Sequence, residues 1–387
     1  MVQLNGAVRL TLMVTPEGRG SFSEQTREAL ARLRTALSRQ PMPIRVTVQT
    51  VFLGDAGDQL SCEALLAEHY GAERPITTFV HQPPCGGAAL AIEAWAIGGD
   101  DVKLEWFGAH ALAVSHNDVR WVYVSGIVPP DSDGSVYSGT TEVLLRARSL
   151  LAQAGVSFEN VARTWFYLGD ITGPESDTQR YKELNRARTD FYRGLRFGGG
   201  LLRPAKPHSG YPASTGIGMA GRGLAMSCLA VATQREDVKL TPLENPCQTP
   251  AYAYHLKHSP CSPKFSRAMA LVMGENVTTW ISGTASIVDS ESLHPGDVEK
   301  QTHQTIDNIE RLIGPQNLAA HGLKHAGATL RDLAKVRVYV KRLEDYPRCK
   351  AVCEQRFGSV PVIYALANVC RPELLVEIEG VAFTKQR

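Results

Sequence analysis

The chain has 387 residues, and at about 150 residues per domain this length predicts two or three domains. Hydrophobic residues make up 43% of the chain and charged residues 21%, a composition that excludes a disordered protein. The 41 basic and 39 acidic residues give a formal charge of +2. This near-balance argues against a general binder of nucleic acid or of a membrane surface.

The N-terminal residues alternate between apolar and polar and lack the parts of a secretory signal. No apolar run approaches the roughly 18 residues that a membrane helix needs. The eight cysteines form no CxxC pair, so we expect reduced thiols in a cytoplasmic protein. Cys349 and Cys353 stand four residues apart without histidines at ligand spacing, and no glycine-rich phosphate loop follows a strand. We therefore expect neither a metal nor an organic cofactor.

Three parts of the chain repeat one order of predicted elements, with strands where β-branched residues alternate and helices where apolar residues recur every three or four positions. The first part is shorter and contains residues 46–53, 59–70, 75–80 and 89–96. The middle part contains residues 121–128, 141–154, 162–168, 181–192, 211–218 and 224–232. The last part contains residues 277–286, 303–313, 333–340, 346–357, 360–369 and 374–383.

A repeat of this length indicates copies of a whole small α+β domain and not a solenoid. Each amphipathic helix has to cover one face of its sheet, and the three sheets can cover one another's remaining faces. The charged, proline-containing segment 234–250 is the clearest boundary. We predict domains at residues 1–100, 101–235 and 250–387.

The last part resembles the YjgF/RidA family along nearly its whole length. The matching segments are residues 280–284, 304–309, 327–333, 335–340 and 376–382. That family forms trimers of a chorismate-mutase-like domain with ligand sites between subunits. The resemblance implies three such repeats in one chain, folded as an intramolecular pseudo-trimer and monomeric in solution.

The whole chain resembles a narrower group, the FkbO-type chorismatases. The segments that carry this resemblance are residues 163–167, 180–188, 211–218, 263–268 and 369–378. The implied substrate is chorismate, a dicarboxylate with an enolpyruvyl ether. The implied reaction is cleavage of that ether, which releases pyruvate.

One acid in the closing strand of the last part is the candidate catalytic residue. Glu377 has its counterparts in Ser227 of the middle part and Ala91 of the first, so only the last part would carry a carboxyl there. A carboxyl in an apolar cleft stays protonated near neutral pH, as a general acid must. Glu379 has the same parity along the strand, and one of the two could be a solvated residue.

The two carboxylates of chorismate need cationic or hydroxyl partners. Each candidate could instead be a surface charge, a core aromatic or a turn residue. The candidates are Lys350, Arg163, Arg188, Tyr254, Ser214 and Thr215.

Two further positions bear on the product. The pair Gly283 and Cys370 resembles the chorismatase branch that makes 3-hydroxybenzoate, whereas the hydrolytic branch tends to carry Ala and Gly. Gly283 would leave room in the pocket, and Cys370 would place a weak S–H donor against the ring. Cys370 could also be an ordinary buried cysteine.

Three functions remain open on the sequence. The first is a chorismatase that makes 3-hydroxybenzoate, with the hydrolysed diene as a variant product. The second is a RidA-like enamine or imine deaminase, which the lack of a carboxylate-binding arginine at Ile363, Ser214 and Thr77 disfavours. The third is a ligand-binding protein without catalysis.

Overall fold

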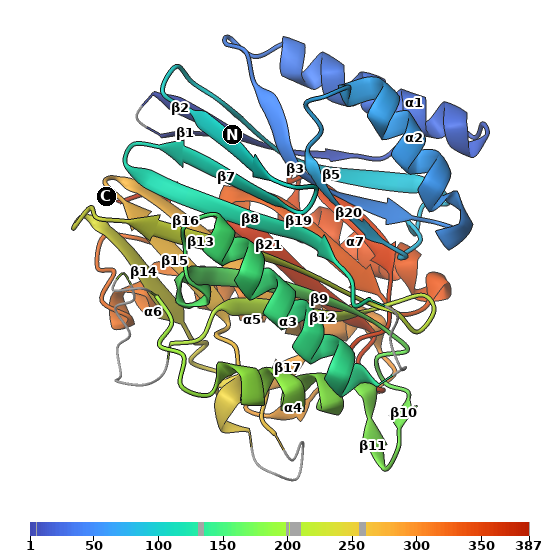
Figure 1. Ribbon diagram of the computed structural model, residues 1–387. Coiled ribbons are helices and arrows are strands. Elements are labelled where there is room, and N and C mark those ends of the chain that lie inside the picture. Colours follow the sequence, from blue (N-terminus) through green and yellow to red (C-terminus); the bar gives the residue numbers. More distant parts are fainter. Residues whose placement is uncertain (5, 131–134, 199–200, 202–209, 255–260, 387) are drawn as a thin grey trace.

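The computed structural model describes the chain except residues 5, 131–134, 199–200, 202–209, 255–260 and 387. Three large antiparallel-dominated sheets follow one another along the chain, each with helices on one face (Figure 1). The fold is α+β, as the sequence predicts. No helix within the described residues is both long and apolar enough to cross a membrane.

Sheet one is built from the first quarter of the chain, in the strand order β1-β2-β5-β3-β4. Its strands are β1 (Val2–Leu4), β2 (Ala7–Val14), β3 (Arg45–Leu53), β4 (Ile76–Val80) and β5 (Leu90–Gly98). The helices α1 (Phe22–Ser38) and α2 (Gln59–Tyr70) lie side by side on its outer face (Figure 1). The elements before residue 45 were not predicted. This repeat is therefore less degenerate than its sequence indicates.

Sheet two has the order β12-β9-β13-β8-β7-β6. Its strands are β6 (Lys103–Phe107), β7 (Ala111–His116), β8 (Val119–Ile127), β9 (Val161–Gly169), β12 (Ala213–Met219) and β13 (Leu224–Thr233). The helices α3 (Val136–Gln153) and α4 (Arg180–Tyr192) pack on it. The helix α3 begins five residues before the predicted start because Ser135 caps it by accepting a hydrogen bond from the Ser138 N–H.

Sheet three has the order β14-β15-β16-β21-β19-β20. Read from the other end, from β6 to β12, sheet two has the same arrangement. Its strands are β14 (Val238–Leu243), β15 (Ala268–Met273), β16 (Asn276–Ala285), β19 (Leu333–Val340), β20 (Val362–Leu366) and β21 (Val376–Lys385). Its helices are α5 (Val298–Ile313), α6 (Pro315–Ala320) and α7 (Tyr346–Phe357). The segment 234–250 is not only a link, since β14 lies within it and pairs with β15.

Several short elements complete the fold. Two small hairpins join β10 (Pro174–Glu175) to β11 (Thr178–Gln179) and β17 (Ile287–Val288) to β18 (Glu291–Ser292). Single 3-10 turns occupy Ala56–Asp58, Phe158–Asn160, Ala251–Ala253, Leu330–Asp332 and Leu343–Asp345.

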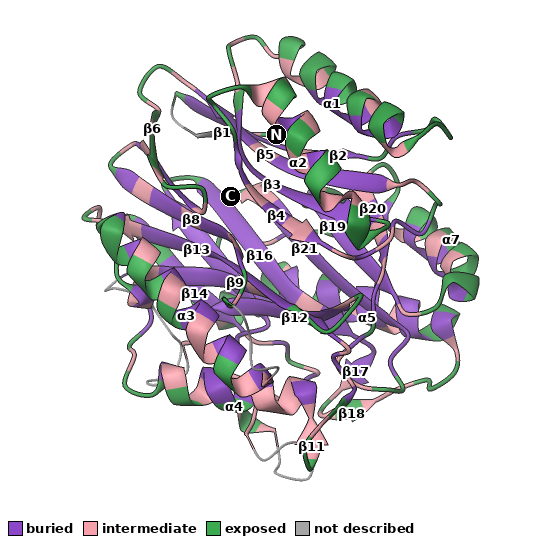
Figure 2. Ribbon diagram, turned by 45° about the vertical axis from the view of Figure 1, so that its right-hand side comes forward, coloured by how far each residue is buried: buried purple, intermediate pink, exposed green. Residues whose placement is uncertain are grey.

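The three sheets meet in the interior through the faces that carry no helices. One buried cluster includes Ile97 of sheet one, Trp121 of sheet two and Trp280 of sheet three, and the two indole rings lie 6.1 Å apart. Strands are buried over most of their length, whereas the helices expose their outer faces (Figure 2). Burial of these inward faces supplies the hydrophobic stabilisation that a separate trimer would obtain between its subunits.

Strand β21 shows how one sequence serves both faces of a sheet. Val376 and Ile378 point towards α5 and join the apolar cluster beneath it. Glu377 and Glu379 alternate with them and therefore point towards the interior, where sheets two and three meet. Both carboxyl groups are buried, which excludes the alternative that one of them is solvated.

Candidate active site

A cavity of about 790 Å³, including its open mouth, lies between sheets two and three. Strand β12 and helix α4 form one wall, and β16, β21 and the segments before β15 and β21 form the other. Every described residue that lines it falls between positions 179 and 377. The lining residues are Gln179, Tyr181, Lys182, Asn185, Arg188, Ser214, Gly216, Tyr254, Pro263, Phe265, Arg267, Gly283, Ala285, Ile287, Cys370, Arg371 and Glu377.

Glu377 projects from β21 into this cavity with 4% of its surface exposed. Among the described residues its carboxyl has no hydrogen-bond or ion-pair partner. Burial raises the pKa of Glu377 to about 8, with a further contribution from the charge of Glu379, while Arg163 and Arg267 oppose the rise. The carboxyl is therefore mostly protonated at neutral pH and can donate a proton.

Gly283 lies directly beside this carboxyl. A Cβ atom at position 283 would stand 2.0 Å from Glu377 Oε1 and 3.2 Å from Thr215 Cγ2. The glycine therefore provides the space that the acid itself occupies. The room that Gly283 was expected to leave in the pocket is thus taken by the Glu377 carboxyl.

Cys370 lines the cavity on the segment that leads into β21. Burial, together with the nearby Glu377, raises the pKa of the Cys370 thiol to about 12. The residue is consequently a neutral S–H group at physiological pH, a weak donor and not a nucleophile.

Arg188 presents a buried guanidinium to the cavity from α4. Only 1% of the residue is exposed, Nη2 donates to Asn185 Oδ1 at 2.6 Å, and Nη1 donates to Ser214 Oγ at 3.3 Å. Within the described residues, its Nε has no hydrogen-bond partner and no carboxylate pairs with it. A buried cation that lacks a counter-ion is suited to bind an anionic ligand.

Arg267 is a second buried guanidinium at the cavity, and it was not selected from the sequence. It precedes β15 and donates through Nη2 to the Tyr254 hydroxyl at 2.6 Å and to the Thr249 carbonyl at 3.0 Å, while its Nε has no described partner. The signal available in the sequence was an arginine directly before an apolar strand, within a segment that resembles chorismatases. Tyr254 is brought to the site as predicted.

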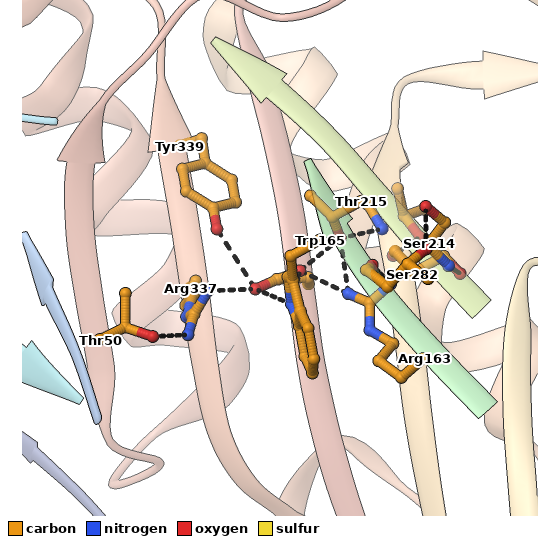
Figure 3. Close-up of polar contacts among 12 residues, drawn as sticks. Thr50, Arg163, Trp165, Ser214, Thr215, Ser282, Arg337 and Tyr339 are labelled. Atoms are coloured by element: carbon orange, nitrogen blue, oxygen red, sulfur yellow. Dashed lines mark hydrogen bonds and ion pairs between the residues drawn. The ribbon is translucent and has the colours of Figure 1, made fainter. Parts of the chain in front are cut away.

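Arg163 and Thr215 lie next to the cavity and not on its wall. Arg163 Nη2 donates to Glu379 Oε2 at 2.5 Å and to Thr215 Oγ1 at 2.6 Å (Figure 3). Thr215 Oγ1 also accepts the Gly283 N–H at 2.9 Å. Both residues, predicted as ligands of substrate carboxylates, are thus engaged by protein groups and do not line this cavity.

Lys350 is placed away from the site. It lies on α7 with 43% of its side chain exposed, and its Nζ stands 3.6 Å from Glu354 Oε1. Predicted as a substrate ligand, it does not line the cavity that holds Glu377. The helix α7 belongs to sheet three but covers the face opposite to the cavity, where its buried residues join the cluster around α5.

Cross-strand pairing corrects the comparison of the three closing strands. Glu377 pairs with Tyr339 on β19, and the matching pair in sheet two is Ala225 with Tyr167. Ser227 instead pairs with Trp165, as Glu379 pairs with Arg337. The counterpart of Glu377 is therefore Ala225 and not Ser227, and sheet three remains the one with an acid at this position among the described strands.

Comparison with known proteins places this site in a family. The model of the N-terminal part of FkbO/Hyg5-like chorismatases matches residues 93–230, and the model named endoribonuclease L-PSP matches residues 258–384. A crystal structure of a chorismatase covers 98% of this chain, and the chain covers all of it, with a TM-score of 0.72 at 22% identity.

Two curated relatives are more similar in sequence. The chain is 34% identical over 295 residues to a 3-hydroxybenzoate synthase of Streptomyces hygroscopicus, which covers 75% of this chain and 80% of the relative. It is 33% identical over 277 residues to a chorismatase of Streptomyces rapamycinicus, with 69% and 78% covered. By sequence over most of both lengths, and with a fold to match, this chain belongs to the FkbO/Hyg5-like chorismatase family.

Proposed function

We propose that the protein is a chorismatase that cleaves the enolpyruvyl ether of chorismate to 3-hydroxybenzoate and pyruvate, with Glu377 as the general acid. The observation that carries this proposal is the position of Glu377. It is a buried carboxyl without a described partner, protonated at neutral pH, in a cavity that also presents two buried arginines. A protonated acid beside cationic groups suits a dianionic substrate that is activated by protonation.

The first step is the transfer of the Glu377 proton to the enol methylene carbon. The methylene becomes the methyl group of pyruvate, and positive charge develops on the ether carbon and its oxygen. The ring carbon–oxygen bond then breaks as the neighbouring ring hydroxyl attacks the same ring carbon, which forms an epoxide, and the hydroxyl proton replaces the one that Glu377 lost. The epoxide then opens at the carbon that originally carried the hydroxyl. The carbon that keeps the oxygen loses its hydrogen as a proton, the oxygen gains one, and the ring becomes aromatic. The two products together contain all the atoms of chorismate, so this route consumes no water.

Two cationic groups are available for the two carboxylates of the substrate. Arg188, which is held by Asn185 and Ser214, can bind one carboxylate by donating hydrogen bonds from its guanidinium edge. Arg267, held by Tyr254, can accept the other. Arg371 extends this second group, because it also lines the cavity and its guanidinium carbon lies 5.4 Å from the centre of the Tyr254 ring.

The product depends on what attacks after protonation. We propose that the S–H group of Cys370 donates the hydrogen bond that favours attack by the ring hydroxyl over attack by water. Cys370→Ala removes this donor and should raise the share of the hydrolysed diene while pyruvate is still released. Chromatography of the aromatic and diene products measures the ratio, and an unchanged ratio at undiminished rate would remove the role from Cys370.

The function itself is tested by incubating the purified protein with chorismate. We expect pyruvate, detected with lactate dehydrogenase, and 3-hydroxybenzoate in equal amounts. Pyruvate together with the diene alone would identify the hydrolytic variant. If chorismate is left intact while an enamine substrate releases ammonia, the proposal is wrong and the deaminase function takes its place.

A further inference from the structure

The mechanism above leaves a group of buried charges unused. Five ionisable side chains form it, and we call them the central charge cluster: Glu93, Arg163, Lys335, Arg337 and Glu379. All five have at most 3% of their side chains exposed. They come from β5, β9, β19 and β21, so each of the three sheets contributes at least one charge.

Glu379 is the centre of the cluster. One of its oxygens accepts from Arg163 Nη2 at 2.5 Å, and the other lies 3.0 Å from Arg337 Nη1. Three further groups donate hydrogen bonds to the same carboxylate. They are Trp165 Nε1 at 3.1 Å, the Tyr339 hydroxyl at 3.2 Å and the Thr215 hydroxyl (Figure 3). Burial opposes the ionised form, but Arg337, Arg163 and Lys335 outweigh it and lower the pKa of Glu379.

Sheet one enters through Glu93. Its carboxylate accepts from Lys335 Nζ at 2.6 Å, from Arg337 Nε at 2.6 Å and from Arg337 Nη2 at 2.8 Å. Three cations thus stand against two carboxylates, and the cluster has a surplus of one positive charge. Buried charges at this density are stable only when each has a partner, and all five have one.

The cluster meets the acid through Thr215. This residue lies against Gly283 and shares its hydroxyl among the Gly283 N–H, Arg163 and Glu379. Gly283 in turn lies beside the Glu377 carboxyl. Glu379 is also two residues from Glu377 on the same face of β21.

From this arrangement we propose that Arg163, Glu379 and Thr215 are positioning residues of the reaction, which hold Glu377 in place and balance the charge around it. Glu379 pairs with Arg163 and Arg337, so Glu377 can remain protonated before the reaction. The surplus positive charge then stabilises the carboxylate that Glu377 becomes when it gives up its proton. This proposal rests on Glu377 being the acid.

The test has to consider every charged or titratable group that faces Glu377. These groups are Glu379 on its own strand, Arg163 on β9, Tyr181, Lys182 and Arg188 on α4, Tyr254 and Arg267 before β15, and Cys370 and Arg371 before β21. Glu379 and Arg163 also belong to the central charge cluster, and neutral substitutions at these two positions change the charge around Glu377 in opposite directions.

The experiment measures the pH dependence of kcat for pyruvate release. A general acid works while it is protonated, so kcat falls as pH rises through the pKa of Glu377. Glu379→Gln removes a repelling charge and frees two arginines, so the fall should move to lower pH by about one unit or more. Arg163→Met removes an attracting charge and should move the fall to higher pH. Arg163→Lys should restore the wild-type position.

Thr215→Val tests the geometric part with a substitution of nearly the same shape. We expect kcat to fall about ten-fold with KM unchanged, because only the alignment of the acid is lost.

Arg9→Met is the matched control for Arg163→Met. Arg9 is also buried, and its guanidinium lies 3.4 Å from the centre of the Trp121 ring without facing Glu377. This variant should leave the pH profile unchanged.

Opposite shifts in the two variants cannot arise from general destabilisation. Shifts of the same sign, or none, in folded Glu379→Gln and Arg163→Met would overturn the proposal. If Glu379→Gln does not fold, Arg163→Met, its Lys variant and Thr215→Val still decide. Full activity of Glu377→Gln would instead refute the choice of acid, so the two failures are distinguishable.

Discussion

Two clefts of this molecule are built on the same plan and differ in their chemistry. The candidate active site lies between sheets two and three, and its counterpart lies between sheets one and two, with a volume of about 1700 Å³ including its open mouth. The glycine after the serine is retained in both, as Gly283 and Gly126. Ser282 and Ser125 each donate a backbone N–H to the residue that precedes the neighbouring strand.

The functional groups are not retained in the counterpart cleft. Ala225 stands where Glu377 does, and His110 stands where Arg267 does, as the matching backbone hydrogen bonds show. The helix α2 presents Gln59, Glu63, Leu66 and Tyr70 and no arginine, and Arg74, which also lines this cleft, follows the helix. The fold therefore supplies the cleft, while three side chains, Glu377, Arg188 and Arg267, supply the proposed chemistry.

The largest expected effect separates the acids of the two clefts. Glu377→Gln keeps the shape but removes the transferable proton, so kcat for pyruvate release should fall at least about a hundred-fold. Glu63→Gln makes the same chemical change in the counterpart cleft and should leave the rate unchanged. Equal rates for the wild type and folded Glu377→Gln would show that the proton comes from another group.

A second test compares the cations. Arg188→Met and Arg267→Met each remove one proposed carboxylate partner, and kcat/KM should fall by about ten- to a hundred-fold, since a charge-assisted hydrogen bond contributes roughly 1.5–3 kcal/mol. Arg74→Met, at the counterpart cleft, is the control and should have no effect. Steady-state kinetics with chorismate decide. An unchanged KM and kcat in either active-site variant would exclude that arginine from binding.

A third test uses the shared glycine. Gly283→Ala places a methyl group 2.0 Å from the movable Glu377 carboxyl, so we expect kcat to fall about ten-fold while the protein remains folded. Gly126 has φ +63° and its added Cβ would stand 2.6 Å from the Thr77 carbonyl oxygen, so Gly126→Ala should lower Tm and leave the chemistry intact. Thermal unfolding and steady-state kinetics of both variants check this. A loss of kcat in Gly126→Ala together with a loss of Tm alone in Gly283→Ala would contradict the prediction.

The smallest effect concerns stability. Folding raises the pKa of Glu377 from 4.5 to about 8, so the folded state holds the proton more tightly than the unfolded state. This contribution is complete below pH 4.5 and is lost as pH rises to about 8. Glu377→Gln cannot ionise, so its Tm should decline less than that of the wild type between pH 5 and 9. Parallel declines would mean that Glu377 is ionised in the folded protein.

The sequence predicted most of sheets two and three because their strands and helices have clear periodicity. It missed β1, β2 and α1, which precede the first recognised strand, and the strands β6, β7 and β15. It also treated the segment that holds β14 as a link. It aligned Ser227 with Glu377, an error of two residues that cross-strand pairing corrects to Ala225. A shift of two preserves the alternation of a strand, so the hydrophobic pattern cannot detect it.

The sequence by itself determined the α+β class, the three repeats, and Glu377, Gly283 and Cys370 as a group, because these depend on local patterns and on a family resemblance. The tertiary structure decided which of the predicted cations line the cavity, since Arg188 does and Arg163 and Lys350 do not. Arg163 forms an ion pair with Glu379, and Lys350 lies on the outer helix α7. Arg267, which was not predicted, lines the cavity in their place. Charge partners are separated by up to a few hundred positions along the chain, as in the pair of Arg163 with Glu379, so their pairing follows from how the sheets pack and not from any local spacing.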